Sequence, residues 1–286
     1  MCGITGYLRF DDGAVDPALI HRMCQTLVHR GPDDVGVFTK KNIGIGMRRL
    51  SIIDLETGKQ PISNEDSTIY IVFNGEIYNY KEIRQDLIQR GHSFKTSSDT
   101  EVIVHLYEEY GIGCLEYLNG MFAFAVWDDR NKKLFCARDR LGIKPFYYLL
   151  DKKRLIFASE LKAILEEGEL QHEIDFDALS QFLTFEFIPF PRTLIKSVKK
   201  LPPGHYLLAD SEQVRLQKYW YPEEIDEIRI NEEEAVEELE SLLNDSVRLR
   251  LRSDVPFGAF LSGGIDSSSI VAQMNSLLTD KVKTFS

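Results

Sequence analysis

The chain has 286 residues, of which 43% are hydrophobic and 28% charged, and its formal net charge is −11. This composition is typical of a globular protein, and the length allows one large domain or two ordinary ones. The acidic balance argues against a nucleic-acid partner, because a phosphate backbone requires a basic face. No apolar run reaches the roughly 18 residues of a membrane span, and the first residues lack the features of a signal peptide. We therefore expect a cytoplasmic protein with neither a nucleic-acid nor a membrane partner.

The four cysteines are scattered, without CxxC pairs and without histidines at ligand spacing. They predict neither a disulfide framework nor a zinc site. These residues are Cys2, Cys24, Cys114 and Cys136.

Cys2 has a special position, because removal of Met1 would make it the N-terminal residue. Its thiol and its α-amine would then belong to one residue. An α-amine titrates at about 7.7–8.0 and a Cys thiol at about 8.5, so the amine can take the thiol proton without a histidine. The simpler interpretation is that Cys2 only begins a strand, since residues 4–8 have a β pattern.

The next elements are a helix over 16–27, capped by Asp16, and a strand-like run over 44–54. Between them, residues 29–34 contain a Gly-Pro pair and are interpreted as a helix end with solvated charges. Arg49 is flanked by apolar residues. Its planar guanidinium suits the capture of an α-carboxylate, although a surface ion pair is the commoner role of an arginine.

A strand over 68–73 is apolar on both faces, as expected between two layers. It ends in Asn74-Gly75, for which we predict a tight turn that exposes a side-chain amide and a backbone N–H. These are the donors that an oxyanion hole requires. A helix over 79–90 follows, and its inward residues are expected to be Ile83, Leu87 and Ile88.

Ser98 and Glu101 have the spacing of a capping box, so the plain role of Asp99 is to complement a helix dipole. From 121 the period changes to two, which predicts a hairpin of strands 121–127 and 133–138. Strands at 146–149, 155–158 and 206–208 and a helix over 177–185 complete a region in which strands dominate and helices lie outside.

Residues 222–230 are acidic and aperiodic and are interpreted as a domain boundary. A helix over 231–251 follows, with Asn231 as its cap. Its inward residues are predicted to be Ala235, Val236, Leu239, Leu242, Leu243 and Val247. A strand over 255–261, a Ser/Gly loop over 262–268 and a helix to 278 come next. This layout directs backbone N–H groups at phosphate, although the lysine of a Walker A loop is absent.

Seven segments resemble the class II, N-terminal-nucleophile glutamine amidotransferases. They are Met-Cys-Gly-Ile at 1–4, His-Arg-Gly-Pro-Asp at 29–33, and the segments 49–54, 73–79, 98–101, 120–125 and 138–145. The loop 262–268 is similar to the pyrophosphate loop of N-type ATP pyrophosphatases. Together these features resemble the glutamine-hydrolysing asparagine synthetase family.

The resemblance implies an α+β fold, a four-layer αββα sandwich, followed by the beginning of a parallel α/β nucleotide-binding domain. The expected domains are a glutaminase domain over 1–212, a linker over 213–230 and an incomplete synthetase domain over 231–286. The chain stops inside what would be the next strand, so we expect a truncated protein that keeps glutaminase chemistry and lacks ligase activity.

The resemblance also implies roles for individual residues. Cys2 would be the nucleophile, Asn74 and Gly75 the oxyanion hole, and Arg49 the partner of the glutamine α-carboxylate. Asp99, with Gly75 and Glu76, would hold the glutamine ammonium. The remaining implied glutamine-binding residues are Leu50, Ser51, Ile52 and Ile53. The implied ATP-binding residues are Leu261, Ser262, Gly263, Gly264, Asp266, Ser267 and Ser268.

The implied substrates are glutamine, aspartate and ATP, with Mg²⁺ as cofactor and Asp266 as a candidate Mg²⁺ ligand. No cofactor is expected for the glutaminase step, and a homodimer is compatible with the sequence. Phosphoribosylpyrophosphate and hexosephosphate amidotransferases share the first domain, but their acceptor domains lack the Ser/Gly loop. A β-lactam-forming or peptide-amidating synthetase would keep it. A non-catalytic regulatory protein on this fold would have lost Cys2, Arg49, Asn74 or Asp99, and all four are present.

Overall fold

The computed structural model describes residues 1–286 except 12, 171 and 223–228. It divides into two compact units, Met1–Tyr221 and Pro222–Ser286. The expected linker, 213–230, includes residues 223–228, which lie outside the described residues. Residues at its start form β12 (Val214–Lys218), which pairs with β11 (His205–Ala209), so that part of the expected linker is a strand of the first unit.

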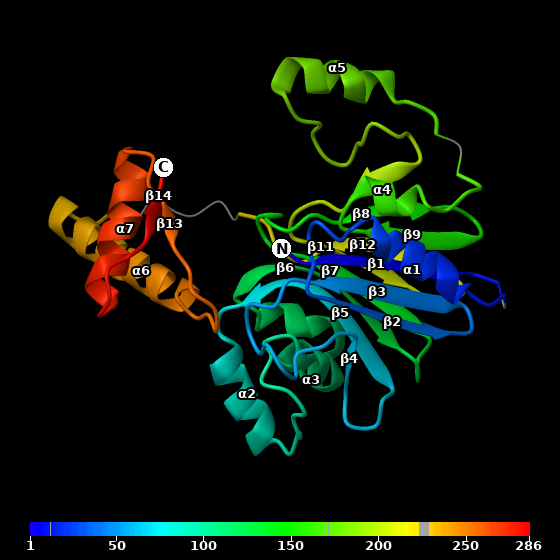
Figure 1. The fold of residues 1–286 in the computed structure, drawn as a ribbon, viewed down its shortest axis with the longest axis horizontal. Helices are drawn as coiled ribbons and strands as arrows, with labels where there is room; N and C mark the ends of the chain where they lie inside the picture. Colours follow the sequence, from blue (N-terminus) through cyan, green and yellow to red (C-terminus); the bar gives the residue numbers. More distant parts are fainter. Residues whose placement is uncertain (12, 171, 223–228) are drawn as a thin grey trace. The chain divides into compact units, whose positions relative to one another are not determined.

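The first unit contains two six-stranded antiparallel sheets (Figure 1). In order across the first sheet, the strands are β10 (Val198–Lys200), β8 (Tyr147–Leu150), β9 (Arg154–Ala158), β1 (Gly3–Arg9), β3 (Ile43–Arg49) and β2 (Asp34–Lys40). In the second sheet they are β12, β11, β7 (Lys133–Arg138), β6 (Gly120–Asp128), β5 (Ile69–Ile77) and β4 (Ile62–Ser63). The predicted hairpin is therefore confirmed as β6 and β7.

Three apolar clusters separate four layers of this unit. One cluster lies between the two sheets and includes Ile4 and Trp127. A second joins the first sheet to α1 (Pro17–Gln25) and α4 (Leu161–Ile164), and a third joins the second sheet to α2 (Tyr80–Gln89) and α3 (Glu101–Tyr110). Figure 1 shows these two helix pairs on opposite sides of the sheets. The predicted αββα sandwich is confirmed.

Side chains alternate between the two faces of each strand, so one sheet can present an apolar face to each neighbouring layer. In β3, Ile43, Ile45 and Met47 belong to the cluster between the sheets. The intervening glycines face α1: a Cβ on Gly46 would lie 2.6 Å from Cys24 Sγ. The small residues let α1 pack closely on the sheet. Asp16 caps α1 by accepting from the Ala18 N–H at 2.9 Å, as predicted.

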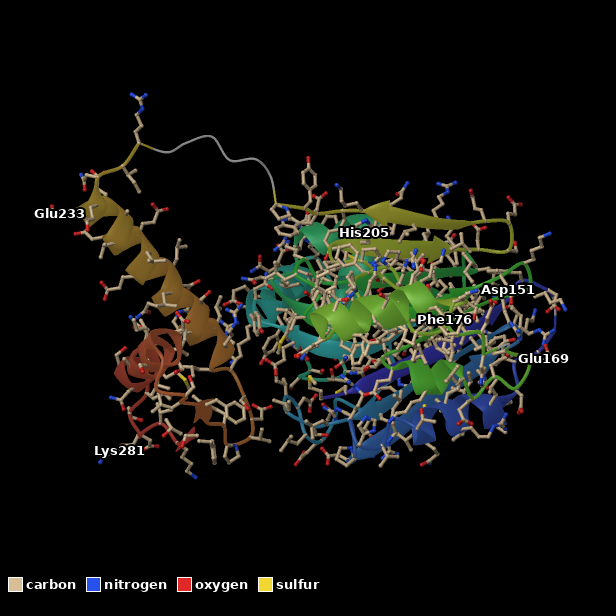
Figure 2. All side chains as sticks on the ribbon, turned by 90° about the horizontal axis from the view of Figure 1, so that it is seen from above. Asp151, Glu169, Phe176, His205, Glu233 and Lys281 are labelled. Carbon is tan, nitrogen blue, oxygen red and sulfur yellow. The ribbon has the colours of Figure 1, made fainter. Side chains whose placement is uncertain are left out.

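Some helices of the first unit carry exposed apolar side chains. Ile88, predicted to face inward from α2, is exposed, because the buried stripe of that helix runs through Tyr80, Ile83 and Leu87. The helix α5 (Phe176–Phe185) begins with Phe176, which is labelled in Figure 2 and is also exposed. The short 3₁₀ helix η1 (Gly111–Glu116) follows α3.

The second unit consists of α6 (Glu232–Arg250), β13 (Ala259–Phe260), α7 (Ile265–Leu277) and β14 (Thr284–Phe285), with β13 and β14 parallel. Asn231 caps α6 in a capping box with Glu234, which confirms the predicted start of the helix. Val247 is buried as predicted, but Val236, Leu239 and Leu242 are exposed. The predicted inward face of α6 is thus correct only near its C-terminal end. None of the described helices combines the length and apolar character needed to cross a membrane.

Candidate active site

A pocket of about 160 Å³ lies in the first unit where β1 begins and β3 ends. Cys2 and Arg49 line it from the first sheet, and Asn74 lines it from β5 of the second sheet. Asp99, from the connection between α2 and α3, completes the wall. The volume is below the roughly 300–1,000 Å³ of sites for drug-sized ligands, so the pocket suits a small metabolite.

Cys2 presents its thiol to this pocket from a fixed backbone. The Leu50 N–H donates to Cys2 Sγ at 3.4 Å, and Arg30 Nε donates to the Cys2 carbonyl at 2.8 Å. Arg30 belongs to the segment interpreted above as solvated, but its side chain is largely buried. Burial raises the pKa of the Cys2 thiol, whereas the Leu50 N–H and the Arg49 guanidinium lower it. The thiol therefore needs a base to remove its proton near neutral pH.

The predicted base, the α-amine of Cys2, exists only after Met1 is removed. In the chain with Met1, the nitrogen of Cys2 is an amide, and the free α-amine belongs to Met1, which lines the same pocket. Burial lowers the pKa of that amine, and the charges of Arg30 and Lys144 lower it further. This end of the pocket therefore favours a neutral amine, which is the form that accepts a proton.

Asn74 lies inside β5 and not in the predicted turn, because β5 continues to Ile77, which pairs with Gly120 of β6. The Asn74 side chain is only 1% exposed, and its Nδ2 has no hydrogen-bond partner among the described residues. A buried donor without a partner costs about 1–3 kcal/mol. Such a group is expected to find its acceptor in a ligand.

The Gly75 N–H faces the same edge of β5 as two neighbouring donors. The Phe73 N–H donates to Gln60 Oε1 at 2.7 Å, and the Ile77 N–H donates to Asp99 Oδ2 at 2.9 Å. Backbone N–H groups alternate between the two edges of a strand, so that of Gly75 points the same way as these two. A Cβ on Gly75 would lie 2.2 Å from the Met121 carbonyl oxygen, which explains why this position requires glycine.

Arg49 is buried at the end of β3 and organises the loop that follows. Its Nη2 donates to the carbonyls of Ile53 at 2.9 Å and Asp54 at 2.6 Å. In the described parts of the chain, no carboxylate lies within ion-pair distance of Arg49. A buried guanidinium that faces a pocket without a carboxylate partner is suited to bind a ligand carboxylate.

Asp99 is a buried residue of the same pocket wall as Arg49 and Asn74. Burial, together with the charge of Glu76, raises its pKa from 3.8 to about 7, although the Ile77 N–H acts in the opposite direction. The predicted capping box is wrong: α3 begins at Glu101, whose carboxylate accepts from the Lys95 and Thr96 N–H groups. Asp99 is thus a buried carboxylate facing the pocket, and an ammonium group there would stabilise its charged form.

The pocket gathers all but one of the predicted glutamine-site residues. Ser51 is the exception: it is absent from the pocket wall, and its N–H donates to Asp33 Oδ2 at 2.8 Å. Sequence reasoning missed Gln60, Thr100 and Lys144, which also line the pocket. Lys144 belongs to one of the resembling segments, which was the available signal. Gln60 connects the Phe73 N–H to Thr100 Oγ1, and no local sequence pattern predicts this contact between distant residues.

The predicted ATP loop of the second unit is open to solvent. Gly263 has φ +80°, a conformation that favours glycine, and Gly264 is the N-cap of α7 without a side-chain hydrogen bond. Ser262 Oγ and Ser267 Oγ lie 3.1 Å apart, and Ser267 Oγ donates to the Gly264 carbonyl at 3.2 Å. The first-turn N–H groups of α7 have no partner within their own helix, so this end can accept an anion. Asp266 is exposed in the first turn.

Comparison with known families gives two matches along the chain. The glutamine amidotransferase domain family matches residues 1–220, and the asparagine synthase family matches residues 238–286. The chain belongs to the glutamine amidotransferase domain family. The first match contains the whole pocket, and the second contains the Ser/Gly loop.

Among the relatives of this amidotransferase chain are two named as asparagine synthetases. The glutamine-hydrolysing asparagine synthetase 1 of Bacillus subtilis is 43% identical over 100% of the chain and 45% of its own length. A putative asparagine synthetase of Methanocaldococcus jannaschii is 42% identical over 100% of the chain and 59% of its own length. The chain thus spans about half the length of these relatives.

A solved structure with the same fold is the glutamine phosphoribosylpyrophosphate amidotransferase of B. subtilis. It has a TM-score of 0.56 and 20% sequence identity, and the match covers 77% of this chain and 50% of that one. At this identity the likeness supports the αββα fold of the first unit.

Proposed function

We propose that this chain hydrolyses the side-chain amide of glutamine in the pocket of its first unit. The observation that carries the proposal is the buried Asn74 Nδ2, which has no partner among the described residues in a pocket that also contains a thiol, a guanidinium and a carboxylate. These groups match the three polar parts of glutamine. Arg49 pairs with its α-carboxylate, Asp99 pairs with its α-ammonium, and Cys2 meets its carboxamide.

The reaction begins when the α-amine of Cys2, free after removal of Met1, takes the proton of the thiol. Sγ then attacks the carboxamide carbon, and the oxygen that becomes negative accepts hydrogen bonds from Asn74 Nδ2 and the Gly75 N–H. Collapse of this intermediate breaks the C–N bond, and the Cys2 ammonium returns its proton to the departing ammonia. The γ-glutamyl thioester that remains is attacked by water, which releases glutamate and restores the thiol.

We further propose that the ammonia serves ATP-dependent synthesis of asparagine from aspartate in the whole protein. Two observations support this: the names of the relatives and the match of residues 238–286 to the asparagine synthase family. The first turn of α7 and the left-handed Gly263 fit a phosphate group, which residues 261–264 and 266–268 would hold. Asp266 is a suitable oxygen ligand for the accompanying Mg²⁺, which would neutralise phosphate charge.

The test of the glutaminase proposal is glutamate release by the purified chain, with the N-terminus checked by intact mass. We expect Cys2→Ala to lower the rate at least about 10⁴-fold, because the nucleophile is lost. Cys24→Ala is the matched control, since Cys24 is a buried thiol packed between α1 and the first sheet. Unchanged glutamate release by Cys2→Ala would refute the proposal.

A further inference from the structure

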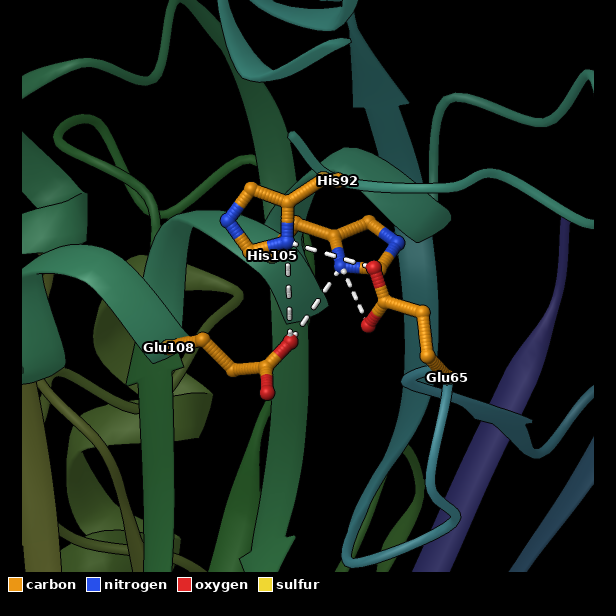
Figure 3. Close-up of side chains that lie close together, drawn as sticks. All are labelled: Glu65, His92, His105 and Glu108. Carbon is orange, nitrogen blue, oxygen red and sulfur yellow. Dashed lines mark hydrogen bonds and ion pairs between the residues drawn. The ribbon is translucent and has the colours of Figure 1, made fainter. Parts of the chain in front are cut away.

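Four side chains that play no part in glutamine hydrolysis converge beside α3 (Figure 3). Glu65 follows β4, His92 follows α2, and His105 and Glu108 lie on α3. One nitrogen or oxygen from each residue belongs to a group of atoms that all lie within 4.8 Å of one another. Two imidazoles and two carboxylates are a donor set used for transition metals.

The nitrogen-to-oxygen separations within this cluster lie in the longer part of the range found for ion pairs of the described residues. His105 Nδ1 lies 3.3 Å from Glu108 Oε2 and 3.4 Å from Glu65 Oε2. His92 Nδ1 lies 3.4 Å from Glu65 Oε1 and 3.9 Å from Glu108 Oε2. For comparison, the ion pair of His29 with Glu160 is 2.9 Å long, and that of Arg192 with Asp175 is 3.4 Å long.

These separations are close to those of ligands that share one ion. Zinc binds imidazole nitrogen and carboxylate oxygen at about 2.0–2.2 Å, so two ligands of a tetrahedral ion are separated by roughly 3.3–3.6 Å. The four nitrogen-to-oxygen distances run from 3.3 to 3.9 Å, with His92 nearest to Oε1 and His105 nearest to Oε2 of Glu65. One donor atom from each residue lies within 4.8 Å of the other three, so rearrangement of the side chains would bring all four donors to a common ion.

Each carboxylate of the cluster has one oxygen held by another residue. Glu108 Oε1 accepts from Asn64 Nδ2 at 2.7 Å, which leaves Oε2 directed at the two histidines. Glu65 Oε1 accepts from the Ser93 N–H at 2.9 Å, and Oε2 lies toward His105. Outer hydrogen bonds of this kind fix the orientation of metal ligands.

Of the two histidines, His92 is held from outside in the same way. Both present Nδ1 to the centre of the cluster, as Figure 3 shows. Nε2 of His92 bonds to Glu109 at 3.0 Å, whereas Nε2 of His105 lies 3.7 Å from Glu101 and has no hydrogen-bond partner among the described residues. A carboxylate behind an imidazole fixes its tautomer and strengthens it as a metal ligand.

The surroundings of the cluster are negatively charged overall. Four carboxylates, of Glu65, Glu101, Glu108 and Glu109, contact the two imidazoles. The neighbouring cations only partly compensate them. Lys95 Nζ donates to the main-chain carbonyls of Asn64 and Glu65. Arg90 bonds to Asp86 at 2.8 Å and lies 4.0 Å from the outer oxygen of Glu109. A divalent cation would balance this charge.

We propose that Glu65, His92, His105 and Glu108 form a binding site for one zinc-like divalent transition-metal ion. The site joins the turn after β4, the connection between α2 and α3, and α3 itself. That connection continues into Ser98 and Asp99 of the glutamine pocket. The metal would therefore be structural and would hold the segment that carries Asp99. The proposal is independent of whether the chain hydrolyses glutamine.

The test is metal binding by the full chain, freed of metal with a chelator and titrated with Co²⁺ and Zn²⁺. We expect one Co²⁺ per chain with the intense visible absorption of a tetrahedral site, displaced by Zn²⁺, and a higher Tm with Zn²⁺. Glu65→Gln and His92→Gln remove ligands near the surface and should weaken Zn²⁺ binding at least 100-fold. Glu109→Gln, behind His92, should weaken it about 10–100-fold. His21→Ala, an exposed histidine on α1, is the control and should bind like the parent chain.

Two results would overturn the proposal. One is a folded parent chain that binds neither ion with 1:1 stoichiometry at micromolar concentration. The other is stoichiometric binding that Glu65→Gln and His92→Gln leave unchanged, which would place the ion elsewhere. Circular dichroism of each metal-free variant establishes that it is folded, and the two surface-proximal variants keep the test valid if changes at the buried His105 prevent folding.

Discussion

The two units of this chain differ in how they treat their apolar residues. Leu87 of α2 is completely buried in the first unit, whereas Leu239 of α6 in the second is 66% exposed. In the first unit, each sheet is covered by helices on its outer face and by the other sheet on its inner face, and its pocket residues are fixed by buried partners. The described part of the second unit covers α6 only near its C-terminal end, and its Ser/Gly loop lies in solvent. We therefore expect glutamine chemistry to be a property of the first unit alone.

The largest expected effect concerns Asn74. We expect Asn74→Ala to lower kcat for glutamine hydrolysis about 10²–10³-fold, because it removes an oxyanion donor. Its effect on unfolding should be small, since Nδ2 makes no bond within the described residues. Asn42→Ala is the control, because Asn42 Nδ2 bonds only to the Arg9 carbonyl outside the pocket. A kcat loss of less than about threefold for Asn74→Ala would reassign this residue to strand structure.

Asp99→Asn should weaken glutamine binding about 100-fold, because a buried carboxylate that faces the substrate ammonium is lost. The same change should stabilise the free protein. Burial raises the pKa of Asp99 from 3.8 to about 7, so above pH 7 the folded state carries a disfavoured charge, at a cost of about 4 kcal/mol. Urea unfolding at pH 8 measures this gain. Asp128→Asn, a buried carboxylate outside the pocket, should leave glutamine binding unchanged. Equal losses of binding in both variants would contradict the role of Asp99.

The pH dependence of binding follows from the same carboxylate. Because the pKa of Asp99 is about 7 without ligand, its charge is lost as the pH falls through 7. The Kd for glutamine should then rise, approaching about tenfold per pH unit. Calorimetry on Cys2→Ala measures this without titration of the thiol. A Kd that is constant between pH 5.5 and 8, or that Asp99→Asn leaves with the same slope, would contradict the assignment.

The smallest expected effect belongs to the second unit. Leu239→Ala should change the free energy of unfolding by less than about 0.5 kcal/mol, because the side chain is already largely in water. Leu87→Ala, the same substitution in the first unit, should cost about 2–5 kcal/mol. Thermal unfolding of both variants compares them directly. A large loss for Leu239→Ala would mean that α6 has a partner in solution.

Much of the first unit could be predicted because its patterns are local. Asp16 caps α1, the period-two run at 121–127 forms β6, and the apolar run before Asn74 lies between layers. Asn74-Gly75 was predicted as a turn because that pair usually bends a chain. In the structure, β5 pairs with β6 over its full length, so the chain stays extended through Asn74 and Gly75. The absence of a side chain at Gly75 instead allows close packing on Met121.

The remaining site features depend on contacts between distant parts of the chain. Arg30 reaches the carbonyl of Cys2, and Gln60 bridges β5 to Thr100, across separations that no local pattern encodes. Glu101 has the spacing of a capping-box residue but bonds to Lys95 and Thr96, because the loop before α3 folds back onto it. The exposed face of α6 was predicted as buried because its periodicity is that of a core helix.

The most direct test of the central claim is labelling by a glutamine analogue that carries an electrophile in place of the carboxamide. We predict one label per chain, on Cys2 of molecules that have lost Met1, with the same rate when the Ser/Gly loop is altered by Asp266→Asn. Excess glutamine should protect against the label. Labelling on Cys24, Cys114 or Cys136, or labelling of Cys2 that glutamine does not slow, would contradict the account.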